Sequence, residues 1–170
     1  MRSPDSWWIL GAAATVFFAA CAGAPAYVAP SGANTASLTI VNGTLDALPV
    51  FAYSDGRNCT GKTQMHPGIA RRASATLAIT ANTPFTFAAA GSTALNSQSA
   101  PRGRIAGVAY CTFVGTFVPR PGRSYLAHYR IDMAREGCLM TVREQARDRS
   151  GNKSLVPVAG FRLRDGANCN

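Results

Sequence analysis

The chain has few of the residue types on which enzyme active sites most often depend. Only eight of its 170 residues are acidic and only two, His66 and His128, are histidines. The acids are spread mostly over predicted turns, no G-x-S-x-G elbow occurs, and neither histidine has an evident nucleophile beside it in the sequence. We therefore predict no catalytic residues and no cofactor, and we expect that the protein is not an enzyme.

Metal-binding spacings and helical periods are also absent. No C-x-x-C pair occurs, and the two histidines lie at no spacing typical of zinc ligands. Beyond the N-terminal residues, no segment shows the apolar period of an amphipathic helix. We predict no metal site and a domain built from strands.

The sequence does have one uninterrupted apolar run at its start, from residue 7 to residue 20. Arg2 precedes this run, and small residues and Pro25 follow it. A positive start, an apolar stretch and a small-residue exit are typical of a secretory signal peptide, and the run is shorter than the roughly 20 residues that span a bilayer. We expect residues 1–20 to form a signal helix that directs export and is not part of the fold.

The apolar run ends in Phe18-Ala19-Ala20-Cys21, which is a bulky apolar residue, two small residues and a cysteine. This pattern resembles the lipobox of bacterial lipoproteins, and the chain is similar in organisation to small lipoproteins that carry a β-sandwich domain. The resemblance implies that Cys21 is lipidated and becomes the first residue. It also implies that Ala22, in place of an aspartate, favours the outer membrane, with the domain facing the periplasm. Ordinary cleavage after Ala22, which would release a soluble protein, stays open.

The rest of the chain has the pattern of a tethered β domain. Residues 21–36 are small, uncharged and punctuated by proline, which predicts a flexible tether with an end-to-end distance of roughly 20 Å. From residue 37 to residue 170, apolar residues recur with the period of two that is typical of strands with one buried face. We predict an all-β sandwich of seven or eight antiparallel strands, immunoglobulin-like or transthyretin-like, with the strand order left open. The predicted strands are 37–42, 49–53, 75–80, 85–89, 108–118, 124–131, 138–144 and an edge strand within 155–163.

Four cysteines remain in the domain once Cys21 is assigned to lipid: Cys59, Cys111, Cys138 and Cys169. An even number in an exported protein predicts two disulfides, and three connectivities are open. We favour Cys59 with Cys111 and Cys138 with Cys169, because the second bond would hold the C-terminal tail against the preceding hairpin.

Residues 56–63, GRNCTGKT, match the phosphate-binding loop pattern G-x-x-x-x-G-K-T. A nucleotide-binding loop opens a helix, but Pro67 and Gly68 follow shortly after Thr63 and the next residues have a strand pattern. We interpret the segment as a glycine-rich hairpin turn with Cys59 at its tip, and we expect no nucleotide.

The net charge of +9 comes almost entirely from arginine, since Lys62 and Lys153 are the only lysines. The arginines are scattered singly rather than clustered, which is typical of a solvated sheet face and gives no reason to expect nucleic acid. An anionic envelope partner, such as lipopolysaccharide or phospholipid headgroups, is the alternative reading of this charge. Our leading hypothesis is a structural or binding module held to the membrane by its lipid. The second is a periplasmic inhibitor or accessory subunit of an envelope enzyme or secretion machine, which would contact a protein partner through the polar connection 90–105.

Overall fold

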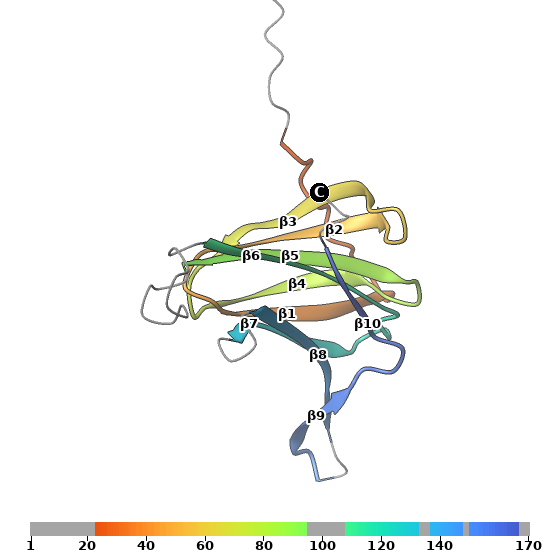
Figure 1. Ribbon diagram of the computed structural model, residues 1–170. Helices are drawn as coiled ribbons and strands as arrows, with labels where there is room; N and C mark the ends of the chain where they lie inside the picture. Colours follow the sequence, from red (N-terminus) through yellow and green to blue (C-terminus); the bar gives the residue numbers. More distant parts are fainter. Residues whose placement is uncertain (1–22, 95–107, 133–136, 148–149, 167–170) are drawn as a thin grey trace, which may run out of the picture.

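The computed structural model describes residues 23–94, 108–132, 137–147 and 150–166. These residues form two five-stranded sheets, and none of them is helical (Figure 1). The prediction of an all-β sandwich is confirmed. The first sheet has the order β4-β1-β7-β8-β9 and the second the order β10-β6-β5-β2-β3. The strands are β1 (Thr35–Gly43), β2 (Leu48–Asp55), β3 (Thr60–Ile69), β4 (Ser74–Thr80), β5 (Phe85–Ala94), β6 (Val108–Phe117), β7 (Ser124–Asp132), β8 (Gly137–Arg147), β9 (Lys153–Pro157) and β10 (Arg162–Asp165).

The strand arrangement differs from the prediction in two respects. The described residues contain ten strands rather than seven or eight, because β3 lacks a regular apolar alternation and the run 155–163 divides between two edge strands, β9 and β10. In addition, β1 pairs with β7 in parallel. An immunoglobulin-like order would place the first strand beside the second. Here β1 lies between β4 and β7, which leaves the transthyretin-like alternative.

The core lies between the two sheets and is built from the inward-facing half of each strand. In β1 the buried residues alternate with half-buried ones, as Leu38 and Ile40 show. The Phe117 and Tyr125 rings, one from each sheet, meet edge to face with their centroids 4.9 Å apart. Aromatic pairs of this geometry are favourable beyond the area that they bury. The predicted period of two therefore corresponds to the core face.

The favoured disulfide pairing is wrong, because the structure joins Cys111 to Cys138 with their Cα atoms 6.0 Å apart. Cys111 of β6 and Cys138 of β8 both pack against the core between the sheets. Cys59, by contrast, contacts a separate cluster formed by Tyr53, Ala88 and Val114 on the outer face of the second sheet. Neighbouring residues of a strand point to opposite faces, so Cys59 and Cys111 lie on opposite sides of one sheet. Cys59 is also disulfide-bonded, and Cys169 lies outside the described residues.

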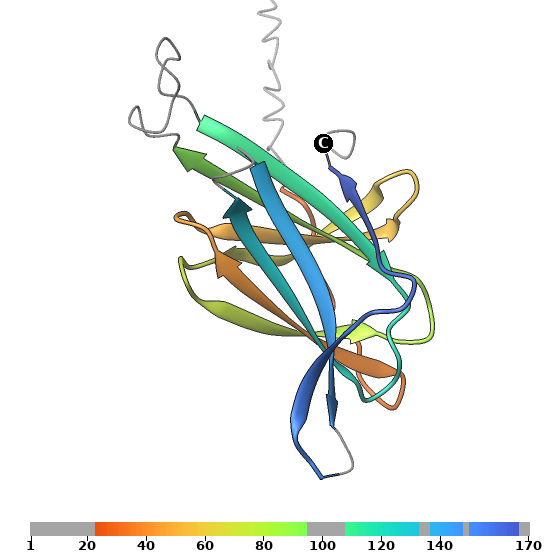
Figure 2. The same ribbon diagram turned by 60° about the horizontal axis from the view of Figure 1, so that its bottom comes forward.

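The β7–β8 hairpin is confirmed, and β8 continues past the sandwich to pair with β9. Figures 1 and 2 show β9 and the end of β8 projecting from the sandwich as an arm. Every residue of β9 is exposed, including Leu155 and Val156. Among the described residues, no strand pairs with the other side of β9, so this part of the chain ends in an open sheet edge.

Part of the predicted tether is bonded to the sandwich. The Gln64 amide of β3 donates to the Pro25 carbonyl at 2.7 Å, and the Tyr27 amide donates to the Gln64 carbonyl at 2.9 Å. The Tyr27 hydroxyl donates to the Ala78 carbonyl of β4 at 3.2 Å, and its ring packs against the core. Burial also raises the pKa of Tyr27. Residues 25–27 therefore join the outermost strands of both sheets at the edge where β3 and β4 lie.

Replacing Tyr27 by alanine is expected to release residues 25–27 from β3. The loss of a half-buried ring and one hydrogen bond should lower the free energy of unfolding by about 1–2 kcal/mol. Hydrogen exchange at the amides of residue 27 and Gln64 should accelerate, because their bonds would open without global unfolding. Val28→Ala is the matched control, since Val28 is 87% exposed. Unchanged exchange at Gln64 in the Tyr27 variant would contradict a docked segment.

Candidate functional site

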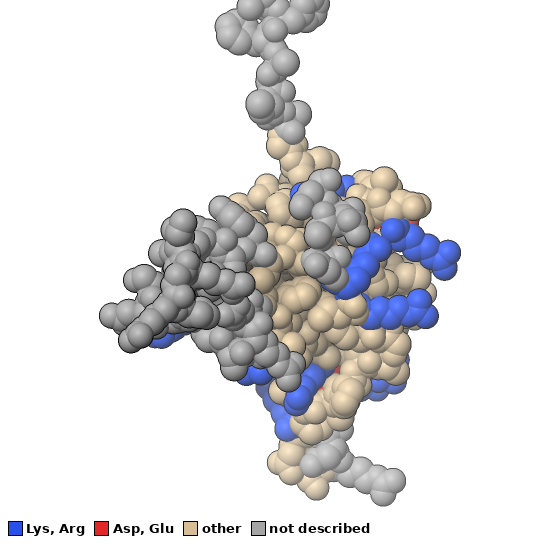
Figure 3. Space-filling view, viewed as in Figure 1, with Lys and Arg blue, Asp and Glu red and all other residues tan. Residues whose placement is uncertain are grey.

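Basic side chains gather on the side of the sandwich that carries the β2–β3 turn and β10 (Figure 3). The outer face of the second sheet forms the floor of this region. Thr116 of β6 lies opposite both Thr86 of β5 and Arg162 of β10. The hydroxyls of Thr86 and Thr116 are hydrogen-bonded at 2.9 Å. Strand register thus places a hydroxyl pair beside an exposed arginine.

The β2–β3 turn closes over one end of this floor. A Cβ on Gly56 would lie 1.9 Å from the Thr86 Oγ1 atom, so only glycine allows the turn to approach this closely. The Asp55 carboxylate accepts hydrogen bonds from the Arg57 amide at 2.8 Å and from the Asn58 side chain at 2.7 Å. The bond from the Asn58 side chain is the main reason that the pKa of Asp55 is lowered. The carboxylate is therefore engaged in holding the turn.

Arg164 of β10 ties the turn to the opposite wall. Its guanidinium donates to the Arg57 carbonyl at 3.1 Å and also to the Gly56 carbonyl. Its Nη2 atom lies 2.9 Å from the Cys59 Sγ atom. A charge that is bonded to carbonyls fixes the geometry of the turn and still contributes to the local positive potential.

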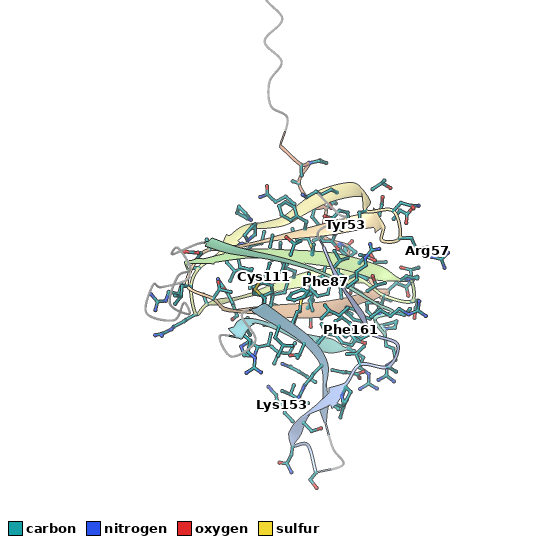
Figure 4. All side chains as sticks on the ribbon, viewed as in Figure 1. Tyr53, Arg57, Phe87, Cys111, Lys153 and Phe161 are labelled. Atoms are coloured by element: carbon teal, nitrogen blue, oxygen red, sulfur yellow. A yellow bond between two sulfur atoms is a disulfide. The ribbon has the colours of Figure 1, made fainter. Side chains whose placement is uncertain are left out.

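The floor, the turn and β10 enclose a groove of about 960 Å³. This volume lies within the range of about 300–1,000 Å³ that is common for ligand sites. Three arginines and four hydroxyl-bearing residues line it: Arg57, Arg162, Arg164, Ser54, Thr83, Thr86 and Thr116. Figure 4 shows Arg57 extending from the turn into solvent. We call this feature the basic groove.

Two of the three guanidinium groups in the basic groove are available to a ligand. Arg57 and Arg162 are exposed. Within the part of the chain that the structure describes, neither side chain forms a hydrogen bond or an ion pair. Of the described residues that line the groove, Asp55 is the one acid, and its carboxylate is held by the turn. The basic groove can therefore attract an anion and donate hydrogen bonds to its oxygen atoms.

One rim of the basic groove is apolar. Val118 is 51% exposed and Leu163 is 38% exposed, and both line the groove together with Pro84. These side chains give the groove an apolar contact area beside its exposed arginines. The combination fits a ligand that has a charged group and an apolar part.

The structure places the predicted site residues unevenly. Cys21 and Cys169 lie outside the described residues, and so does most of the connection 90–105, from residue 95 onward. In the segment 56–63, residues 56–59 form the predicted hairpin turn, with Cys59 in the left-handed region at φ 55°, and residues 60–63 begin β3 in place of a helix. The groove arginines were not predicted as a site. The pattern Arg162-x-Arg164 could have indicated them, because residues two positions apart in a strand lie on the same face.

The two histidines of the described residues do not form a second candidate site. His66 Nδ1 accepts a hydrogen bond from the Gly68 amide at 3.1 Å, and His128 is exposed on the outer face of the first sheet. Among the described residues, no three histidine, cysteine or acidic side chains are close enough to hold a metal ion. The same residues include no helix of the length and apolar character that crossing a membrane requires.

Glu144 is the buried carboxylate of the described chain, and its surroundings make it a structural group. Its side chain is 7% exposed and accepts hydrogen bonds from Arg120 Nη2 at 2.7 and 2.5 Å. Arg123 Nε lies 3.7 Å from its Oε1 atom. The Arg120 amide also donates to the Tyr125 hydroxyl at 2.9 Å. The cluster fixes the β6–β7 connection at the end of the sandwich.

Replacing Glu144 by glutamine should lower the free energy of unfolding by about 2 kcal/mol, because a buried neutral amide replaces the anion that faces two guanidinium groups. Urea denaturation would measure the change. Arg143→Gln is the control, since it alters one charge at the exposed neighbouring position of β8. The two changes shift the net charge in opposite directions, so equal losses of stability in the two variants would show that the buried pair makes no special contribution.

Comparisons with known protein families, curated proteins and solved structures find no match to this chain. Any functional conclusion therefore depends on the chain's own residues and geometry.

Proposed function

We propose that this protein is an exported envelope lipoprotein whose β-sandwich is a non-enzymatic binding module for an anionic envelope component. Lipid on Cys21 holds the module to the outer membrane, on the periplasmic side. The observation that carries the binding proposal is the basic groove, where Arg57 and Arg162 face solvent above a hydroxyl floor. The Cys111–Cys138 disulfide supports export, because such bonds persist in oxidising compartments.

The intact mass of the native protein, taken before and after reduction, tests the export and anchor parts of the proposal. We expect a mass that lacks residues 1–20, includes acyl chains at Cys21 and rises by the protons of two disulfides on reduction. A chain that keeps its leader, or one that carries no acyl mass, would contradict the lipoprotein assignment. Cleavage after Ala22 would instead give a shorter, unacylated chain.

A partner search tests the binding part. The native lipoprotein, cross-linked in whole cells, should be recovered with one anionic component above background. An Arg57→Gln/Arg162→Gln variant should lose that component. Recovery of the same component with the natural protein and with the double variant would show that the component does not bind at the basic groove.

One observation favours the second candidate function, an inhibitor or accessory subunit. The arm formed by β8 and β9 ends in an open edge with Leu155 and Val156 exposed, and such an edge can accept a strand from a partner protein. This candidate predicts a stoichiometric protein complex that Val156→Lys abolishes, because lysine on an edge strand opposes strand addition. A complex that forms equally well with the Val156→Lys variant would show that the β9 edge does not bind the partner.

A further inference from the structure

The docked segment 25–27 determines which edge of the sandwich lies nearest to residue 21. Four residue steps separate Cys21 from Pro25, and a fully extended chain of that length reaches at most about 14 Å. Pro25 is bonded to Gln64 of β3. An acyl chain on Cys21 would therefore hold the β3 edge within about 14 Å of the membrane surface, closer than a free tether of residues 21–36 would hold it.

The wall of the basic groove formed by the β2–β3 turn lies near this edge, whereas β10, which carries Arg162, is the opposite edge strand of the same sheet. Thr60, where the β2–β3 turn enters β3, is four residues from Gln64, which corresponds to about 13 Å along a strand. Figures 1 and 2 both show the β2–β3 turn and the end of β10 on the side of the sandwich where the described chain begins. Anchoring through Cys21 would thus bring the turn wall of the groove, with Arg57, toward the lipid headgroups.

The groove also has the chemistry of a headgroup site. Guanidinium groups bind phosphate oxygens through paired hydrogen bonds. Arg57 and Arg162 supply two such groups to the basic groove. The exposed Val118 and Leu163 lie beside them and can contact the part of a lipid next to its phosphate.

We propose that the basic groove binds the phosphate group of an anionic membrane lipid. Arg57 and Arg162 donate hydrogen bonds to the phosphate, Arg164 holds the β2–β3 turn in place, and the apolar rim contacts the lipid backbone. The proposal deepens the proposed function by naming the ligand class. The orientation of the groove toward the membrane depends on the proposed lipid anchor, whereas its binding chemistry does not.

The test uses the chain 21–170 with Cys21→Ser, disulfides intact, so that no acyl chain can contribute to binding. All described strands lie within this chain. Flotation with phosphatidylcholine vesicles containing phosphatidylglycerol is compared with phosphatidylcholine alone, at physiological salt. We expect binding to the anionic vesicles only. Arg57→Gln/Arg162→Gln should weaken it by about thirtyfold, since two charge-assisted contacts are lost.

The matched control is Arg71→Gln/Arg143→Gln, which removes the same charge from exposed positions in the β3–β4 turn and on the first sheet. It should weaken binding by less than about threefold, because charges far from the contact are screened by salt. Equal losses in the two double variants would overturn the proposal, as would no binding to anionic vesicles.

Calorimetry with inorganic phosphate and glycerol phosphate distinguishes a lipid from a soluble ester. Affinity for these compounds equal to that for the vesicles would overturn the lipid assignment. Thermal unfolding of each variant verifies that it is folded. Because this chain cannot be acylated, a negative result would refute the groove site and leave the lipoprotein assignment to the mass measurement.

Discussion

Replacing Cys111 and Cys138 together by alanine is expected to lower the free energy of unfolding by about 3–4 kcal/mol. The bond closes a loop with a sequence separation of 27, and the chain-entropy treatment assigns roughly this free energy to a loop of that length. The net stability of a small domain is only about 5–15 kcal/mol. Removal of this one bond should therefore move the urea midpoint substantially.

The position of the bond adds to its expected effect. It joins β6 of one sheet to β8 of the other, so it holds the two sheets together at one end of the core. The Tyr129 hydroxyl donates to the Cys111 carbonyl at 2.7 Å, and burial raises the pKa of Tyr129 to about 12. Loss of the bond should loosen this buried contact as well.

Urea denaturation of the double variant, with the reduced natural protein as control, measures the effect. The reduced protein should lose at least as much stability as the variant, because reduction also opens the bond at Cys59. Peptide mapping without reduction should keep the Cys111 and Cys138 fragments joined. A variant as stable as the oxidised protein would show that the loop closure contributes nothing.

The strands were predictable from the sequence wherever one face is buried. The alternation in residues 37–42 and 75–80 corresponds to β1 and β4, and the long run from 108 corresponds to β6. The sequence did not indicate β3, because its residues are largely polar and include Pro67, which has no amide hydrogen. An edge strand tolerates such residues, since one of its sides needs no amide donor for a neighbouring strand. Local pattern therefore identifies strands with an alternating buried face, including the edge strand β4, and misses an edge strand that lacks this alternation.

The disulfide pairing and the candidate site depend on which faces of distant strands meet. Counting by twos along β6 places Cys111 with Phe113 and Phe117 on the core face, but nothing local shows that Cys138 faces it from the other sheet. The groove likewise combines residues of β2, β5, β6 and β10, whose adjacency comes from sheet order. The order of the first sheet depends on the parallel pairing of β1 with β7, and no local pattern in either strand predicts this pairing.

Replacing Asn42 by alanine is expected to lower the free energy of unfolding by about 4 kcal/mol, the largest effect of any single substitution considered for this chain. Asn42 is fully buried at the end of β1. Its Nδ2 atom donates to the carbonyls of Asp46 at 2.7 Å and Ile69 at 2.8 Å, and its Oδ1 atom accepts from the Thr44 amide at 2.9 Å. One amide thus links the β1–β2 connection to the end of β3.

Alanine would remove three hydrogen bonds of the buried Asn42 amide, and each lost bond costs about 1 kcal/mol or more when no water replaces it. Thr44→Val is the graded comparison. It removes only the hydroxyl, which donates to Asn42 Oδ1 at 2.7 Å and lies 3.1 Å from the Asp46 carbonyl, so it should cost about 1–2 kcal/mol. Because the two residues share a bond, the double variant should lose less than the sum of the single losses in urea denaturation. Additive losses, or an Asn42 variant within about 1 kcal/mol of the natural protein, would show that water satisfies these groups and that the amide does not hold the two connections together.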